Sequence, residues 1–185
     1  MEKKAQAFIT KKKKEHKSLE IWFQDEARFG QKGMTTRIWT IEGVRDQHPR
    51  QDGFKSAYFI GAVNPHSGQK YSLLFDGLDS RVMSEFFVGL SKEIKPHRHI
   101  VLIVDGAGWH STEDLIIPSN ITLYFLPPYS PELNPIERLW QHLKDNYLSG
   151  KIFKDMEEIL HIGSEAWCKL TSDCIQSICK TKLQC

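Results

Sequence analysis

Hydrophobic and polar residues alternate along several segments of the chain, which is the pattern of half-buried β-strands. In the first such segment, Leu19, Ile21 and Phe23 alternate with Glu20, Trp22 and Gln24. This strand is expected to end at Asp25. Further strand-like segments are residues 37–41, 57–63, 71–75 and 121–125. Residues 100–104 (IVLIV) are continuously apolar, which predicts a strand buried on both faces within a parallel sheet.

The spacing of apolar residues changes to that of a helix after residue 80. The positions concerned are Met83, Phe86, Phe87, Leu90 and Ile94. Asp79 or Ser80 is suited to cap this helix, and Pro96 stops it. Another helix is expected over residues 153–167, with Gly163 as its weakest point. The order of strands first, then helix, strand, strand and helix indicates one α/β domain.

A proline-rich segment, residues 126–140 (LPPYSPELNPIERLW), leads directly into a further helix. Its prolines restrict the backbone, so the segment is a stiff connector. Asn134 is the expected N-cap and Pro135 the first helical residue, and apolar residues then recur at helical spacing. Glu137 therefore arrives on the first turn of a helix. A capping box with Asn134 is the structural alternative for this glutamate.

Three carboxylates occupy places where a site could form. Asp25 follows the first strand, Asp105 follows the buried strand with Gly106 and Gly108 after it, and Glu137 lies on the downstream helix. The alternatives for the two aspartates are ordinary turn caps. Two charges about 4 Å apart repel by roughly 4 kcal/mol at an effective dielectric near 20, so the cluster would hold protons or a divalent cation. Oxygen ligands alone favour magnesium or manganese over zinc.

The segments around these carboxylates resemble the catalytic core of a DDE transposase of the Tc/mariner superfamily, in its bacterial insertion-sequence branch. The resemblance runs from about Trp22 to about Phe153. DEARFG and DGAGWH are moderately specific motifs, and PPYSPELNPIE is a strong one. The family's three acidic residues fall on Asp25, Asp105 and Glu137, with 31 residues between the last two, slightly fewer than that branch's usual spacing.

The resemblance implies an α/β, ribonuclease-H-like fold with a mixed central sheet flanked by helices. It implies that Asp25, Asp105 and Glu137 are both catalytic residues and ligands of Mg²⁺ or Mn²⁺, with two ions. The implied activity is cleavage of DNA at transposon ends followed by strand transfer, with transposon ends and target DNA as partners and a homodimer as the active form. Glu26 and Glu132 are rival ligands. The alternatives are an inactive DNA-binding remnant and a ribonuclease-H-like nuclease with other substrates.

Basic residues are concentrated at the start of the chain. Seven lysines and two glutamates give the first seventeen residues a net charge of +5, whereas the whole chain carries +2. A solvated, disordered leader is the alternative, but beside a DNA-cleaving core we expect a DNA-binding arm. The DNA-binding candidates are Lys11, Lys12, Lys13, Lys14, Arg28 and His110. A surface salt bridge for Arg28 and a helix-start hydrogen bond for His110 are the simpler interpretations.

The 185 residues, 40% of them hydrophobic, suit one domain with a substantial core. We expect a basic tail at residues 1–18, a catalytic domain at 19–150 and a helical extension of the same domain at 151–185. The cysteines Cys168, Cys174, Cys179 and Cys185 fit no zinc motif and are expected to be reduced thiols, although a metal site with His161 is conceivable.

The sequence also leads to expectations about the cellular location of the protein and about its DNA-recognition module. No apolar run approaches a membrane span or a signal peptide, so we expect no membrane partner and a cytoplasmic, bacterial, nucleoid-associated protein. About twenty residues precede the first strand, too few for a helix-turn-helix module. We therefore expect the chain to lack end specificity and the helix-turn-helix half of the transposase to be separate, frameshifted or lost.

Overall fold

The structure is a computed structural model that describes residues 2–32, 42–43, 51–106, 115–128 and 130–184. The strand expected at residues 37–41 and the candidate His110 lie outside the described residues. Within the described part of the chain, every helix is too short or too polar to cross a membrane.

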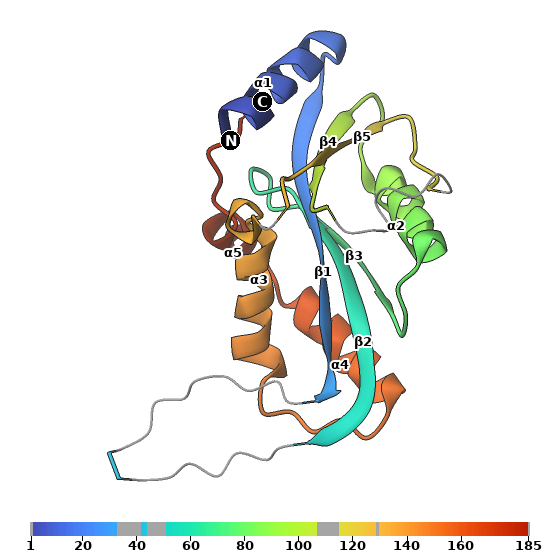
Figure 1. Cartoon of the computed structure of the whole chain (residues 1–185), viewed down its shortest axis with the longest axis vertical. Coiled ribbons are helices and arrows are strands. Elements are labelled where there is room, and N and C mark those ends of the chain that lie inside the picture. Colours follow the sequence, from blue (N-terminus) through green and yellow to red (C-terminus); the bar gives the residue numbers. More distant parts are fainter. Residues whose placement is uncertain (1, 33–41, 44–50, 107–114, 129, 185) are drawn as a thin grey trace.

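A five-stranded mixed sheet forms the centre of the molecule (Figure 1). Its strands, in spatial order, are β3 (Lys70–Phe75), β2 (Asp52–Val63), β1 (Leu19–Lys32), β4 (His99–Val104) and β5 (Ile121–Phe125). The pairs on the β3 side of β1 are antiparallel, and the pairs from β1 to β5 are parallel. All six residues of β4 are buried, and five of them form the continuous apolar run 100–104 for which burial was predicted.

The first strand is longer than its sequence suggested, and the prediction that it ends at Asp25 is wrong. β1 is 14 residues long and runs from Leu19 to Lys32. The parallel pairing with β4 stops at Phe23, but the antiparallel pairing with β2 continues, and Asp25 lies opposite Gly61. A strand that keeps one neighbour still satisfies half of its backbone hydrogen bonds, so the charged residue interrupts one pairing without ending the strand.

Helices cover both faces of the sheet. One face packs against α2 (Ser80–Glu93), whose N-terminus is capped by the Asp79 side chain accepting from the Val82 N–H at 2.8 Å. The other face packs against α1 (Glu2–Glu15), α3 (Ile136–Leu143), α4 (Met156–Cys168) and α5 (Ser172–Ile178). In Figure 1, α2 lies on one side of β1, and α3 with α5 lies on the other.

The basic N-terminal segment forms a helix, so its interpretation as a disordered leader is wrong. Ala5 and Ile9 of α1 are buried against the sheet, and the Phe8 ring lies 5.0 Å from the Tyr124 ring. The Gln6 side chain also donates to the Gln184 carbonyl at 2.8 Å and accepts from its N–H at 3.1 Å. Apolar contacts at helical spacing therefore fix a segment that its lysine content alone would leave in solvent.

The C-terminal residues supply two helices. α4 was expected over residues 153–167, and it spans Met156–Cys168 with Asp155 as N-cap. The helix continues through Gly163, where a Cβ would lie 2.4 Å from Cζ of Phe29. The glycine allows the helix to lie close on β1. α5 was not predicted, since its seven residues are too short to establish a period.

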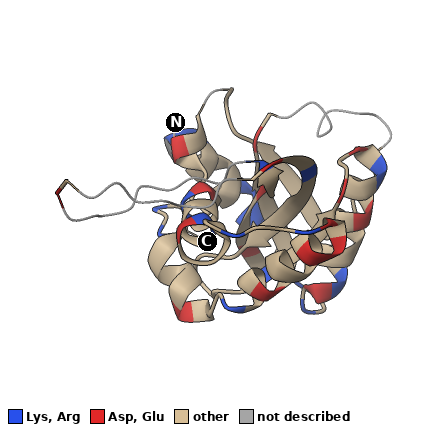
Figure 2. Ribbon diagram, turned by 90° about the horizontal axis from the view of Figure 1, so that it is seen from below, with Lys and Arg blue, Asp and Glu red and all other residues tan. Residues whose placement is uncertain are grey.

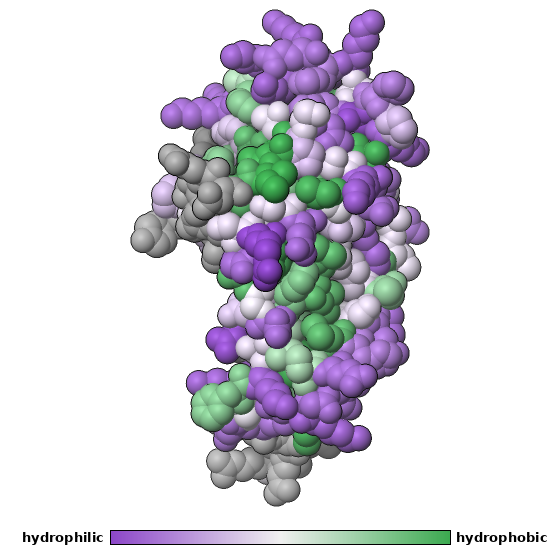
Figure 3. All heavy atoms as spheres, turned by 90° about the vertical axis from the view of Figure 1, so that its right-hand side faces the viewer, coloured by the Kyte–Doolittle hydropathy of each residue, from purple (hydrophilic) through white to green (hydrophobic). Residues whose placement is uncertain are grey.

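Charge is mixed over much of the surface. Lys and Arg alternate with Asp and Glu along the ribbon in the view of Figure 2. The end of the molecule formed by α1 is strongly hydrophilic, as the top of Figure 3 shows.

Candidate active site

The parallel pairing of β1 with β4 brings the two candidate aspartates together. Phe23 pairs with Ile103, and Asp25 and Asp105 each follow two residues later, on the same face of the sheet. One carboxylate oxygen from each of Asp25, Glu26 and Asp105 lies within 4.8 Å of the others. Among the described residues, this is the group of acidic, histidine or cysteine side chains arranged to hold a metal ion.

Glu137 completes an acidic pocket. A cavity of about 410 Å³, which we call the acidic pocket, is lined by Asp25, Asp105 and Glu137 together with residues of the proline-rich segment. The three carboxylates come from β1, the end of β4 and the first turn of α3. Residues more than 100 positions apart in the chain therefore line one opening.

The capping-box interpretation of Glu137 does not fit the described structure. The N–H of Asn134, which a capping box would pair with Glu137, donates to the Pro131 carbonyl at 2.9 Å. Asn134 is extended and its side chain accepts from the Ile136 N–H at 3.4 Å, while Pro135 already has helical dihedral angles. The helix therefore begins at Ile136, one residue later than expected, with Pro135 rather than Asn134 as its N-cap residue, and Glu137 lines the pocket.

Asn134 also ties the proline-rich segment to the central strand. Its side-chain N–H donates to the backbone carbonyl of Gln24 at 2.9 Å, directly before Asp25. The residue is only 3% exposed. A buried amide with both ends hydrogen-bonded fixes the distance between the start of α3 and β1, and hence between Glu137 and Asp25.

A buried tryptophan holds Asp25. The indole N–H of Trp140 donates to Oδ2 of Asp25 at 2.9 Å. Gly61 makes room for it, since a Cβ there would lie 2.6 Å from Cη2 of Trp140 and 3.0 Å from Cη2 of Trp167. The residue opposite Asp25 on β2 must therefore lack a side chain for the indole to reach the carboxylate.

In the sequence, Trp140 is one of the apolar residues that recur at helical spacing after Pro135, and nothing in the local pattern assigns a role to Gly61. Periodicity reports which face of a helix is buried, but it carries no information on the partner of an indole N–H.

The electrostatics of the pocket are unfavourable without a counter-charge. Burial, and then the negative charges of Glu137 and Glu26, raise the pKa of Asp25 to about 8. The Trp140 hydrogen bond acts in the opposite direction but is outweighed. Burial and the charge of Asp105 also raise the pKa of Glu137. Carboxylates that share a site in this way, with oxygen-only donors, fit a hard divalent cation.

The other candidates lie at different distances from the acidic pocket. Glu26 joins the aspartates, whereas Glu132 lines a separate cavity. Arg28 donates from Nε to Oγ of Ser56 at 2.9 Å, and it lines a small cavity of about 140 Å³ together with Glu137. The lysines 11–14 are on α1, at the opposite end of the parallel part of β1 from Asp25.

The C-terminal cysteines do not form a metal centre in the described residues. Cys168, Cys174 and Cys179 are free thiols, which agrees with the expectation of reduced cysteines. Cys174 Sγ lies 3.7 Å from Nε2 of His142, whereas His161 pairs with Glu165 at 3.5 Å. The alternative of a zinc site with His161 finds no support here.

Comparison with known proteins identifies the family of the chain. Residues 20–160 match the model of the DDE superfamily endonuclease family, and the chain belongs to that family. It is also 46% identical over 114 residues to the uncharacterized protein y4pE/y4sA of Sinorhizobium fredii (strain NBRC 101917 / NGR234), covering 62% of this chain and 84% of that protein.

Solved structures show the same fold. The Mos1 strand transfer complex superimposes with a TM-score of 0.68 at 15% identity, over 96% of this chain and 56% of that one. The Mos1 mariner paired end complex with Mn gives a TM-score of 0.70 at 15% identity and covers 96% of this chain and 57% of that one. The complex with Mg gives a TM-score of 0.64 at 13% identity and covers 86% of this chain and 51% of that one. The chain thus spans little more than half the length of these transposases. The ribonuclease-H-like fold expected from the sequence is confirmed.

Proposed function

We propose that the chain is the catalytic part of a transposase of the Tc/mariner type, in the bacterial insertion-sequence branch, which cleaves DNA at transposon ends and joins the freed 3′-hydroxyl to target DNA. The observation that carries the proposal is the meeting of Asp25, Asp105 and Glu137, from three separate elements, at one pocket. The membership in an endonuclease family supports it.

Asp25, Asp105 and Glu137 would hold Mg²⁺ or Mn²⁺, with two ions as the expected number. The pKa of Asp25 supports this assignment, because burial and then the negative charges of Glu137 and Glu26 raise it, and a bound cation would offset these effects. Bound divalent ions would supply a charge that activates an attacking water or 3′-hydroxyl and stabilises the departing oxygen. Glu26 is near enough to be a further ligand.

The chain's own residues prepare the pocket. Trp140 orients Asp25 through one of its two oxygens, and Asn134 holds the start of α3 against β1. The prolines keep the connecting segment in one shape, so Glu137 needs little ordering when substrate arrives. Arg28, which lines a small cavity together with Glu137, would neutralise a DNA phosphate, and the α1 lysines would hold the duplex farther away.

Recognition of transposon ends is proposed to lie in a separate helix-turn-helix part, and the active form is proposed to be a homodimer. The alternatives remain an inactive DNA-binding remnant and a nuclease with other substrates. The retention of all three carboxylates favours an active site over a remnant.

The test is a nicking assay on supercoiled plasmid DNA with Mg²⁺, with Mn²⁺ and with chelator. Cleavage should require metal and should be lost in Asp105→Asn, whose circular dichroism should match the parent. Asp76→Asn, an exposed aspartate after β3, is the matched control and should cleave normally. Equal cleavage by Asp105→Asn and the parent would overturn the site. An inactive parent that still binds DNA would favour the remnant.

A further inference from the structure

A second cavity adjoins the acidic pocket across the proline-rich segment. This cavity of about 340 Å³, here called the loop cavity, shares Leu126 and Pro127 with the acidic pocket as a common wall. Neighbouring residues of the segment face different cavities, because Pro131 and Asn134 line the acidic pocket whereas Glu132 and Leu133 line the loop cavity. A group bound in the acidic pocket would therefore lie next to the loop cavity.

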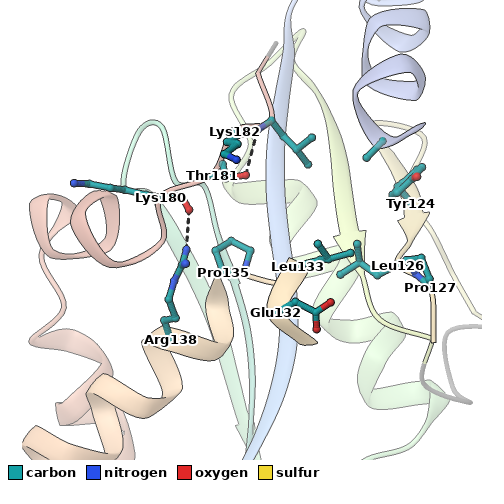
Figure 4. A pocket seen from close by; sticks show the side chains of 12 residues that line it. Tyr124, Leu126, Pro127, Glu132, Leu133, Pro135, Arg138, Lys180, Thr181 and Lys182 are labelled. Atoms are coloured by element: carbon teal, nitrogen blue, oxygen red, sulfur yellow. Dashed lines mark hydrogen bonds between the residues drawn. The ribbon is translucent and has the colours of Figure 1, made fainter. Parts of the chain in front are cut away.

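The floor of the loop cavity is apolar. The side chains of Leu126 and Leu133 meet at its centre, with Pro135 on one side and Tyr124 on the other (Figure 4). Its volume is at the low end of the roughly 300–1,000 Å³ typical of small-molecule sites. The space admits a flat ring with its sugar and excludes a duplex.

The rim carries positive charge. The Arg138 guanidinium is held at the edge by donating to the Lys180 carbonyl at 2.7 Å, and Lys182 lines the cavity near Thr181 (Figure 4). The Lys180 side chain itself extends away from the cavity (Figure 4). An apolar floor beside two cations suits a group that is flat and apolar at one end and anionic at the other, which describes a nucleotide.

One acid faces this space. The Glu132 side chain lines this cavity, with its carboxylate below Leu133 and Leu126 in Figure 4, and within the described part of the chain it makes no hydrogen bond or ion pair. It belongs to the same segment that delivers Glu137, but it does not line the acidic pocket. An acceptor without a partner, beside an apolar floor, selects a ligand with donors on its edge.

We propose, building on the function above, that the loop cavity binds the unpaired nucleobase next to the phosphate in the acidic pocket. Arg138 and Lys182 bind the phosphate on the far side of that nucleotide, and Glu132 accepts hydrogen bonds from the edge of the base. Guanine is the preferred base, because its N1–H and N2–H donate in parallel to the two oxygens of one carboxylate. Thymine presents one donor between two carbonyl oxygens, which a carboxylate repels.

The experiment measures binding of the four deoxynucleoside 5′-monophosphates to the full chain by saturation-transfer NMR, in chelator. Without divalent metal the acidic pocket repels phosphate, so binding reports the loop cavity. dGMP should bind at least about fivefold more tightly than dTMP, the low end expected for a bidentate contact. Glu132→Gln should remove that preference, and Glu85→Gln on the opposite face of the sheet should retain it.

A second pair of variants tests the rim. Lys182→Gln should weaken all four nucleotides by a similar factor, because phosphate contacts do not distinguish bases, and Lys92→Gln on α2 should have no effect. Thr181→Trp, which places a large ring at the rim, should block all four nucleotides. If Thr181→Trp instead separates a dimer of the chain and leaves nucleotide binding unchanged, the cavity is a protein interface and the proposal is overturned.

The outcomes separate this inference from the proposed function. A parent chain that cuts DNA but binds the four nucleotides equally, or not at all, overturns the inference alone. A guanine preference that survives in Glu132→Gln also overturns it. A parent that prefers dGMP through Glu132 but never cuts DNA supports the cavity assignment and overturns the proposed function.

Discussion

Asp25 and Glu137 face the same pocket from two walls that are built differently. The wall of Asp25 is a central strand, where the residue is 6% exposed, hydrogen-bonded by Trp140 and opposite a glycine. The wall of Glu137 is the first turn of a helix behind a proline-rich connector, where the residue is open to solvent. The strand must accommodate the buried carboxylate of Asp25, whereas the helix and its connector must position the exposed carboxylate of Glu137.

The two walls differ in what fixes the carboxylate and in how far the carboxylate is exposed to water. Packing around Asp25 fixes its carboxylate, and the same burial raises its pKa to about 8. At Glu137 the backbone is fixed by prolines and by Asn134, while the carboxylate keeps access to water. Substitutions at the two walls should therefore differ in whether they affect activity, stability or both.

The largest effect is expected at the open wall. Glu137→Gln should lower cleavage more than about a hundredfold, since even residues that only support a metal ligand cost about 10–100-fold. The free energy of unfolding should change by less than about 1 kcal/mol, because no capping box is lost and repulsion from Asp105 is relieved.

Glu157→Gln is the matched control for this change, since Glu157 occupies the same second position of α4 without acidic neighbours in a pocket. It should leave cleavage unchanged. A melting temperature that falls in step with activity in Glu137→Gln would mean that the residue is structural.

The burial of Asp25 should make the stability of the folded chain depend on pH. The pKa of Asp25 is raised from 3.8 to about 8, so the folded chain holds this proton and the unfolded chain releases it. Without metal, the contribution of Asp25 to stability is therefore present at low pH and is lost as pH rises through about 8. We expect a loss of about 1–3 kcal/mol between pH 5 and 8, measured by urea unfolding in chelator.

Asp25→Asn should remove this part of the pH dependence, and Asp76→Asn should not. Mg²⁺ should stabilise the parent more at pH 8 than at pH 5, because only the deprotonated ligands bind metal. The same pH slope in Asp25→Asn and the parent would show that the burial of this carboxylate has no thermodynamic consequence.

A smaller effect is expected from Trp140→Phe, which keeps the ring and removes the donor to Asp25. The variant should lose about tenfold in cleavage rate and in Mn²⁺ affinity, as for one hydrogen bond to a charged group. Trp167→Phe changes an equally buried ring 5.7 Å away in the same cluster and should leave Mn²⁺ affinity intact. Equal losses in the two variants would assign the effect to packing.

The sequence predicted the parts of this site that depend on backbone order. The apolar run 100–104, the prolines and Asn134 identify a buried strand and a helix start, and these elements place Asp105 and Glu137. The resemblance to a transposase core added the assignment of the three acids and the ribonuclease-H-like fold, which is confirmed.

The sequence could not predict the features that depend on contacts between distant residues. The continuation of β1 beyond Asp25 depends on β2, which pairs with it as far as Lys32. The role of Gly61 depends on a tryptophan almost 80 positions later. The folding of α1 depends on a cluster that it shares with the sheet and Leu183. None of these partners can be identified from local periodicity.

The smallest effect is expected far from both walls, at the lysines of α1. Asp25 lies six residues along β1 from Leu19, about 20 Å at 3.3 Å per residue, so a duplex in the acidic pocket can reach the end of the molecule where α1 lies. Lys11, Lys13 and Lys14 are exposed, whereas Lys12 pairs with Glu15 at 2.7 Å.

Replacing these four lysines with glutamine should therefore remove about three phosphate contacts, which flattens the slope of log affinity against log salt by roughly 0.9 for each. Cleavage at saturating DNA should not change, because the acidic pocket is intact. The measurement is a DNA-binding titration at several salt concentrations. The control replaces the exposed Lys92, Lys95, Lys151 and Lys154, which are not on α1. If both sets flatten the slope equally, DNA responds to net charge alone and α1 is not a specific contact surface.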